Sequence, residues 1–272
     1  MTGMPLLKVS GLTITRQESS RDAVHDVSFE VPEGSVLGII GESGAGKTSL
    51  ALALIGLLDR EGTAVSGKIV FRGQDLLELS EEELCSLRGN GIAMIFQDST
   101  GALDPSMRVI DQVAETVMLH QDVKKREARE LAISVLLEAG ISPDVIESAP
   151  YAHQLSGGLC QRAMIAAALV ARPAVLVADE PTSALDVTLQ SQIISMLKVR
   201  KLETGMAIVF ISHDLALVSG FADTIMVLHE GQIVERASTE ELLAHPVHYY
   251  TKQLISAWGF GSIGGGTALA SR

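Results

Sequence analysis

A glycine-rich segment, GESGAGKT at Gly41–Thr48, has the composition of a loop that holds phosphate groups. It follows the apolar run Val36–Ile40, and the residues from Lys47 to Leu58 have a helical pattern. Glycines let main-chain N–H groups converge on phosphate oxygens at a helix N-terminus, where the helix dipole favours anions. A lysine here can reach the β- and γ-phosphates, and the hydroxyl of Thr48 can bind Mg²⁺. This phosphate loop therefore predicts a nucleoside triphosphate site.

Two acidic residues, Asp179 and Glu180, come directly after the apolar run Val175–Ala178, which predicts a buried strand. Ligands bind at the carboxyl ends of the strands in parallel sheets. A carboxylate at such a position can hold Mg²⁺ directly or through water. Its neighbour can polarise a water molecule for attack on the terminal phosphate. We therefore expect Asp179 to bind the metal and Glu180 to act as the general base.

The elements that would position these residues are short β-rich runs that alternate with helical patterns. This alternation predicts a parallel sheet. The further runs are Val27–Val31, Lys68–Phe71, Ile92–Phe96, Ala207–Ile211 and Thr224–Leu228. Gln97 and His213 each follow one of them, but a lone glutamine or histidine after a strand predicts no chemistry by itself. Ser80 and Glu83 form a capping box that predicts a helix to Arg88, and residues 104–165 are helical in pattern.

Three more segments stand in a fixed order after the phosphate loop. They are LSGGLCQR at Leu155–Arg162 (the signature segment), VLVADEPTSALD at Val175–Asp186, and ISHD at Ile211–Asp214. Together the four segments resemble those of ATP-binding cassette (ABC) proteins over nearly the whole chain. The resemblance implies an α/β fold of the ABC ATPase (P-loop NTPase) type, with a RecA-like core, an antiparallel β subdomain and an inserted helical subdomain at about 98–165.

The same resemblance implies one nucleotide-binding domain at residues 1–258. The remaining residues, 259–272, are rich in glycine and serine, a composition that predicts a disordered tail.

The resemblance also implies an ATPase that uses ATP and Mg²⁺, with roles for particular residues. The implied catalytic residues are Glu180, His213, Gln97 and Lys47. The implied Mg²⁺ ligands are Thr48, Gln97 and Asp179. The implied nucleotide contacts are Gly41, Glu42, Ser43, Gly44, Ala45, Gly46, Lys47, Thr48, Ser49, Gln97, Asp179 and His213. A second cassette, packed head to tail, would add Ser156, Gly157, Gly158, Gln161 and Asp186 in trans.

The chain departs from the family pattern at the adenine end of the site. ABC proteins often carry an aromatic residue near the end of the first strand, where it stacks on the base. Here Thr15 or Arg16 stands at that place. An arginine guanidinium can stack on a base, and we leave the base contact unassigned.

Composition excludes several classes of function. The net charge is −12 and no long basic stripe occurs, so extended contact with nucleic-acid phosphates is not expected. No run of eighteen apolar residues predicts a membrane span, and the N-terminus has no pattern of a secretion signal. The two cysteines, Cys85 and Cys160, match no metal-binding spacing and are typical of a reducing compartment.

Three further segments resemble the importer ATPases of the peptide/nickel class. They are RGNGIAMIFQD at Arg88–Asp98, ALDPSMRV at Ala102–Val109 and HPVHYYTKQLISA at His245–Ala257. The sequence continues into glycines without the cysteine-containing extension of many peptide-type members, and Leu159-Cys160 makes the signature segment a non-basic variant. These two features and the missing adenine-stacking aromatic favour nickel or metal-chelate (metallophore) import, with dipeptide or oligopeptide import as the alternative.

The importer resemblance implies partners and a location. The partners are two transmembrane permease subunits, a second ABC ATPase subunit (a paralogue or a second copy) and, through the permeases, an extracytoplasmic solute-binding protein. The chain would lie peripherally at the cytoplasmic face of the inner membrane, with the permeases docking near Gln97–Met107. A soluble ABC ATPase acting on DNA or ribosomes is the less favoured hypothesis, because neither sustained heptads nor a second cassette occurs.

Overall fold

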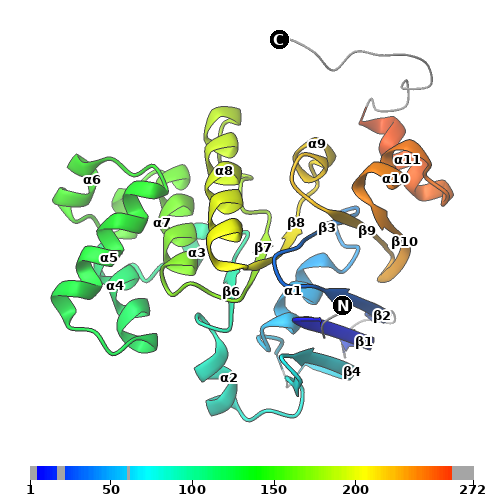
Figure 1. Cartoon of the computed structure of the whole chain (residues 1–272), viewed down its shortest axis with the longest axis horizontal. Coiled ribbons are helices and arrows are strands. Elements are labelled where there is room, and N and C mark those ends of the chain that lie inside the picture. Colours follow the sequence, from blue (N-terminus) through cyan, green and yellow to red (C-terminus); the bar gives the residue numbers. More distant parts are fainter. Residues whose placement is uncertain (1–4, 17–21, 60–61, 259–272) are drawn as a thin grey trace.

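The chain folds into two β-sheets and a set of helices, most of which gather on one side of the larger sheet (Figure 1). The computed structural model describes residues 5–16, 22–59 and 62–258. The predicted disordered tail, residues 259–272, lies outside the described residues.

The larger sheet carries the strands that the apolar runs predict. Its order is β10-β9-β3-β8-β7-β6, and all neighbours are parallel except β10, which is antiparallel to β9. The strands are β3 (Val36–Ile40), β6 (Ile92–Ile95), β7 (Val175–Asp179), β8 (Ala207–Ile211), β9 (Thr224–His229) and β10 (Gln232–Ser238). Every residue of β3, β6, β7 and β8 is buried, as expected for strands covered on both faces.

The smaller sheet is antiparallel, with the order β2-β1-β4-β5. Its strands are β1 (Leu7–Arg16), β2 (Asp22–Val31), β4 (Thr63–Phe71) and β5 (Gln74–Asp75). Helix α1 (Lys47–Leu54) lies between this sheet and the larger one, and its leucines share a single apolar core with both. The predicted strand at Lys68–Phe71 is longer than expected, because it begins at Thr63.

Helix α1 is shorter than the sequence predicts, since it ends at Leu54 and not at Leu58. Gly56 has φ +65°, a left-handed conformation, and its N–H donates to the carbonyl of Ala53 at 3.0 Å. A left-handed glycine just beyond the last turn is a common helix stop.

Helix α2 (Glu81–Leu87) begins as its capping box predicts. The Ser80 hydroxyl accepts the N–H of Glu83, and the Glu83 carboxylate accepts the N–H of Ser80 at 2.8 Å. These bonds satisfy main-chain donors that the first helical turn leaves unpaired.

The predicted helical region already includes a short helix before residue 104, and it ends later than expected, at Val170. Its elements are α3 (Ser99–Ala102), α4 (Val109–His120), α5 (Lys125–Glu138), α6 (Pro143–Ser148), the 3₁₀ turn η1 (Ala152–Gln154) and α7 (Gly157–Val170). The first residues after 104 form a turn, in which the Asp104 carboxylate accepts the N–H of Ser106 at 2.7 Å. The charged patch Lys124–Glu130 is mostly exposed, with Ala128 turned into the core.

The remaining helices follow the strands of the larger sheet. They are α8 (Val187–Thr204), α9 (Leu215–Ser219), α10 (Thr239–Ala244) and α11 (Tyr249–Ala257). Helices α10 and α11 lie beside β9 and β10 (Figure 1). No helix among the described residues is long and apolar enough to span a membrane.

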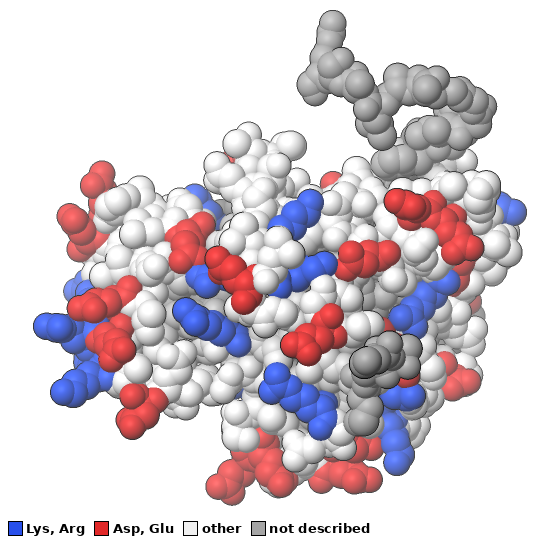
Figure 2. All heavy atoms as spheres, in the orientation of Figure 1, with Lys and Arg blue, Asp and Glu red and all other residues white. Residues whose placement is uncertain are grey.

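Charged side chains of both signs are interspersed over the face seen in Figure 2. Basic side chains lie among acidic ones, with a small basic group at the edge of the helical region. Cys85 is exposed, whereas Cys160 is buried and burial raises the pKa of its thiol.

Candidate active site

The phosphate loop is held tightly between β2 and β9. A Cβ on Gly46 would lie 2.1 Å from the carbonyl oxygen of Ala23, and Gly46 has φ +101°. A Cβ on Gly41 would lie 2.2 Å from the carbonyl oxygen of Leu228. Contacts this short exclude any side chain, so only glycine lets the loop lie against both strands.

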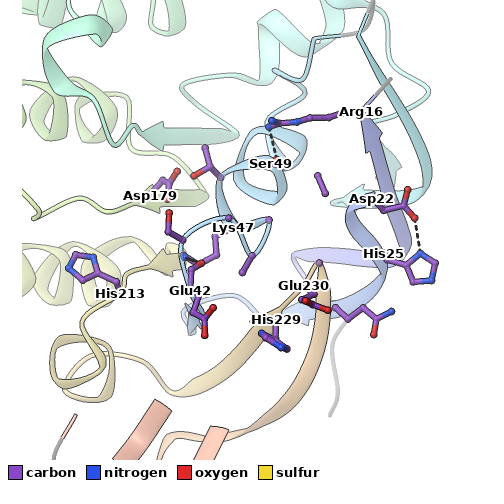
Figure 3. A pocket seen from close by; sticks show the side chains of 18 of the residues that line it. Arg16, Asp22, His25, Glu42, Lys47, Ser49, Asp179, His213, His229 and Glu230 are labelled. Atoms are coloured by element: carbon purple, nitrogen blue, oxygen red, sulfur yellow. Dashed lines mark hydrogen bonds and ion pairs between the residues drawn. The ribbon is translucent and has the colours of Figure 1, made fainter. Parts of the chain in front are cut away.

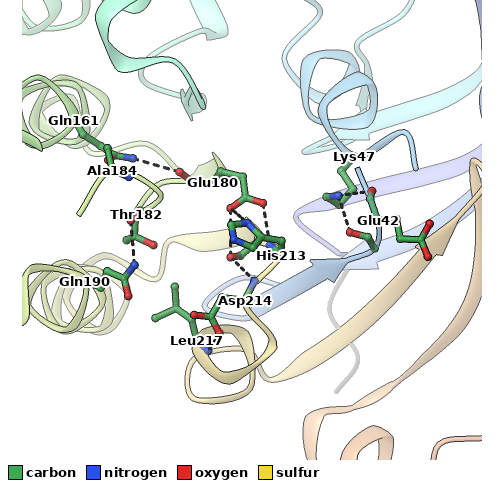
Figure 4. Close-up of polar contacts among 12 residues, drawn as sticks. Glu42, Lys47, Gln161, Glu180, Thr182, Ala184, Gln190, His213, Asp214 and Leu217 are labelled. Atoms are coloured by element: carbon green, nitrogen blue, oxygen red, sulfur yellow. Dashed lines mark hydrogen bonds and ion pairs between the residues drawn. The ribbon is translucent and has the colours of Figure 1, made fainter. Parts of the chain in front are cut away.

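Lys47 opens α1 and folds back over the loop. Its ammonium donates to the carbonyl oxygens of Gly41 and Glu42, each at 2.8 Å (Figure 4). Burial lowers the pKa of Lys47, while the negative charges of Glu180 and Asp179 oppose that shift. The cation is thus placed between the loop and the acidic pair.

A cavity of about 1100 Å³ opens over the loop and collects the predicted residues from separate elements (Figure 3). Gln97 comes just after β6, Asp179 is the last residue of β7, and His213 comes just after β8. Glu180 directly follows Asp179. These strands are parallel neighbours, so their carboxyl ends meet at one edge of the sheet. The predicted residues that line the cavity are Glu42, Ser43, Gly44, Ala45, Gly46, Lys47, Thr48, Ser49, Gln97, Asp179, Glu180 and His213.

Asp179 has the environment of a metal ligand. The residue is only 2% exposed, and its Oδ2 has no hydrogen-bond partner among the described residues. Burial raises the pKa of Asp179, and a hydrogen bond from the Thr48 side chain partly offsets this. A buried carboxylate oxygen without a partner, next to a hydroxyl and facing a phosphate loop, fits Mg²⁺, which prefers oxygen ligands.

Glu180 is fixed by the segment that follows β8. Its carboxylate accepts the main-chain N–H of His213 at 2.9 Å and lies 2.9 Å from the Nδ1 of the same residue (Figure 4). Glu180 has φ +52°, a left-handed conformation that costs free energy for a residue with a side chain. The imidazole is exposed while the carboxylate is almost fully buried.

The signature segment lies apart from the cavity of its own chain. Ser156 is the N-cap of α7, where its hydroxyl accepts the N–H of Leu159 at 3.4 Å. Space is open around Gly157, where an added Cβ would meet no atom within 4 Å. Asp186 caps α8 by accepting the N–H of Leu189 at 3.0 Å. Among the described residues, none of the signature segment lines the cavity over the phosphate loop.

Gln161 corrects the sequence-based expectation. Its side chain is fully buried within its own chain, so it is not available to a nucleotide held by a second subunit. Its amide donates to the carbonyl of Glu180 at 3.3 Å and accepts the N–H of Ala184 at 3.1 Å (Figure 4). Gln161 therefore ties the signature helix to the segment that carries Glu180.

The far end of the cavity is polar. Arg16 donates to the hydroxyl of Ser49 at 3.0 Å, and the Nδ1 of His25 lies 2.9 Å from the carboxylate of Asp22 (Figure 3). The hydrogen bond from Thr15 lowers the pKa of Asp22, and His25 adds to this. Sequence reasoning did not identify Asp22, His25, His229, Glu230 or Gln232 as lining residues. They follow no motif, and only the fold brings them to the cavity.

The family comparison identifies a model described as ABC transporter, which matches residues 24–183. The dipeptide transport ATP-binding protein of Escherichia coli K12 is 43% identical over 256 residues, which cover 93% of this chain and 78% of that protein. The oligopeptide transport ATP-binding protein of the same organism is 43% identical over 255 residues, covering 93% of this chain and 75% of that protein.

Solved structures agree with the fold. A dimeric post-hydrolysis state of the ATP-binding cassette MJ0796, bound to ADP and Pi, has a TM-score of 0.79 and 26% identity, and the match covers 86% of this chain and 98% of that one. The cbiO1 protein from Clostridium perfringens, described as part of a transporter complex, has a TM-score of 0.74 and 28% identity, with 89% and 91% covered.

Proposed function

The chain belongs to the ABC transporter family, and from this premise we propose that it is the ATP-hydrolysing subunit of an importer of dipeptides or oligopeptides. The fold is that of an ABC ATPase cassette, and the activity is hydrolysis of ATP to ADP and phosphate with Mg²⁺. The main support for a peptide cargo is the 43% identity to the dipeptide transport protein over 93% of the chain. These relatives favour the peptide alternative over the nickel or metallophore import expected from the sequence.

In this proposal, each residue around the cavity has a separate role in ATP hydrolysis. The phosphate loop and Lys47 hold the β- and γ-phosphates, because main-chain N–H groups and a cation face that space. Thr48, Asp179 and Gln97 would hold Mg²⁺, which when bound neutralises charge on the phosphate oxygens. Glu180 accepts a proton from the attacking water while the water oxygen bonds to the γ-phosphorus, and the bond from the γ-phosphorus to the bridging oxygen breaks, so that ADP leaves. His213 holds the Glu180 carboxylate, and its exposed imidazole would face the γ-phosphate.

The signature segment acts in trans, with the cassettes of two subunits packed head to tail. Two features support this proposal. Ser156 and Gly157 are exposed at the start of α7, away from the cavity of their own chain, and the solved cassette MJ0796 forms a dimer. The main-chain N–H groups at the start of this fourteen-residue helix would face the nucleotide of the partner. The dimer would consist of this chain and a paralogue, or of two copies.

An apolar groove beside Gln97 is the docking site that we propose for the permeases. It has a volume of about 260 Å³ and lies where β6 meets α3 and α7. Phe96, Leu103 and Met164 line it, and Leu57 stands at its rim with 42% of its surface exposed. Phe96 directly precedes Gln97, so a permease segment in this groove would lie one residue from the site of hydrolysis. The chain would then be peripheral, at the cytoplasmic face of the membrane, and the permeases would link it to the solute-binding protein.

Reconstitution of the chain with its permeases and second ATPase subunit tests the proposal. We expect ATP hydrolysis to rise when a solute-binding protein loaded with dipeptide is added. A Leu57→Cys variant in a Cys85→Ser background should crosslink to a permease, whereas Val199→Cys, which is exposed on α8, should not. If a nickel chelate stimulates ATP hydrolysis and peptides do not, peptide import is rejected. If both positions crosslink equally to a permease, docking in the groove is rejected.

A further inference from the structure

Helix α11 contacts the phosphate loop through Tyr250. Tyr250, the second residue of α11, is 4% exposed, and its hydroxyl accepts the main-chain N–H of Glu42 at 3.1 Å. The two residues are 208 positions apart in the sequence. Glu42 is the second residue of the phosphate loop, so a residue far from every nucleotide-binding motif contacts the loop that holds the phosphates.

The aromatic ring of Tyr250 is fixed as firmly as its hydroxyl. It stacks on the ring of His229 with centroids 3.9 Å apart and an angle of 24° between planes. His229 ends β9 and lines the nucleotide cavity. Burial raises the pKa of Tyr250; the hydrogen bond from the main chain of Glu42 lowers it in part, and the charge of the Glu42 carboxylate adds to the rise.

The end of β9 and the turn that follows it also contact the phosphate loop. The carbonyl of Leu228 lies so close to Gly41 that no side chain fits there. The N–H of Gly231, in the turn between β9 and β10, donates to the carbonyl of Ala45 at 3.1 Å. The Glu42 peptide unit is held at its N–H by Tyr250, and the next carbonyl along the loop, that of Glu42, is held by Lys47.

We propose that Tyr250 is a positioning residue for the phosphate loop, which sets the orientation of the Glu42 peptide and thereby the affinity for ATP. Without the hydroxyl, the Glu42 N–H loses its partner and the start of the loop can rotate. Lys47 is then no longer held over the phosphates by a fixed pair of carbonyls. The inference rests on ATP binding at the loop and is independent of the cargo.

The test compares Tyr250→Phe with Tyr249→Phe in the full chain. Tyr250→Phe keeps the stacked ring and removes only the hydroxyl, whereas Tyr249 is 62% exposed on the same helix and serves as the matched control. Loss of one hydrogen bond is expected to raise the KM and Kd for ATP about 3- to 10-fold, with kcat changed less than about twofold. Tyr249→Phe should behave as wild type.

Each outcome decides the question. A Tyr250→Phe protein with wild-type Kd for a fluorescent ATP analogue overturns the proposal. A fall in both kcat and thermal stability, with an unchanged Kd for the ATP analogue, also overturns the proposal, because a purely structural role would give that result. If the wild-type chain binds ATP but drives no peptide uptake, peptide import is rejected, while the role of Tyr250 in ATP binding still stands.

Discussion

The carboxylate of Glu180 is held by both the main chain and the side chain of His213, with two contacts of 2.9 Å. The two residues lie at the ends of neighbouring strands, β7 and β8, whose pairing brings Asp179 opposite Ile211. The proposed base and its histidine are therefore placed by the register of the sheet. The main-chain contact is set by the backbone alone, whereas the contact of Nδ1 also depends on the rotamer of the exposed imidazole.

Glu180→Gln should retain ATP binding and lose hydrolysis. The amide has nearly the same shape as the carboxylate but cannot accept the proton of the attacking water, so we expect kcat to fall about 10²- to 10⁴-fold. If ATP is held between two cassettes, as proposed above, the variant should accumulate as an ATP-bound dimer in size-exclusion chromatography. Glu147→Gln, an exposed change on α6, is the control. Hydrolysis at the wild-type rate would show that Glu180 is not the base.

Asp179→Asn should stabilise the Mg²⁺-free protein while abolishing its activity. Burial raises the pKa of Asp179 in the folded chain above its value in the unfolded chain. At neutral pH the ionised carboxylate therefore costs the folded state free energy; this cost begins to decrease as the pH falls through the folded pKa and is gone below the unfolded pKa. Thermal unfolding in chelator should give a higher Tm for the variant at pH 7 and a smaller difference in acid. A lower Tm for the variant at pH 7 would contradict this account of the site.

Gln161→Leu should impair the turnover of ATP more than its binding. The change leaves the N–H of Ala184 without its partner and removes one of the two hydrogen bonds to the carbonyl of Glu180, which keeps the one from the N–H of Ser183. We expect a loss of about 1–3 kcal/mol in the free energy of unfolding, and a lower kcat because the segment that carries Glu180 is released. The KM for ATP should change little, since Gln161 does not line the cavity. Gln192→Leu, exposed on α8, is the control, and a wild-type kcat in Gln161→Leu would refute the role.

The sequence predicts the strand ends of the site well, for a physical reason. A run such as Ala207–Ile211 is apolar because both faces of the strand are covered, so its boundary is visible as the first polar residue. Parallel pairing then places Gln97, Asp179 and His213 at a common edge without further information. The phosphate loop is equally visible, since contacts such as that of Gly46 with Ala23 admit only glycine.

Contacts between distant elements are not visible in the same way. Gln161 stands in the signature segment, so the resemblance predicts a contact in trans with the nucleotide of a second subunit, whereas packing of α7 buries its side chain completely. Tyr250 has a place in no nucleotide-binding motif, and its contact with Glu42 depends on how α11 packs beside β9 and β10. The early end of α1 likewise follows from the conformation of one residue, Gly56.

Uptake of a labelled dipeptide tests the central claim most directly. Cells that lack their own copy of this subunit would carry either the wild-type chain or Glu180→Gln, with equal amounts of the transporter complex confirmed. The account predicts that the wild type restores dipeptide uptake, that the variant does not, and that cellular nickel, cobalt and zinc are the same in both. Equal dipeptide uptake in the two strains, with one metal depleted in the variant, would contradict peptide import and identify a metal cargo.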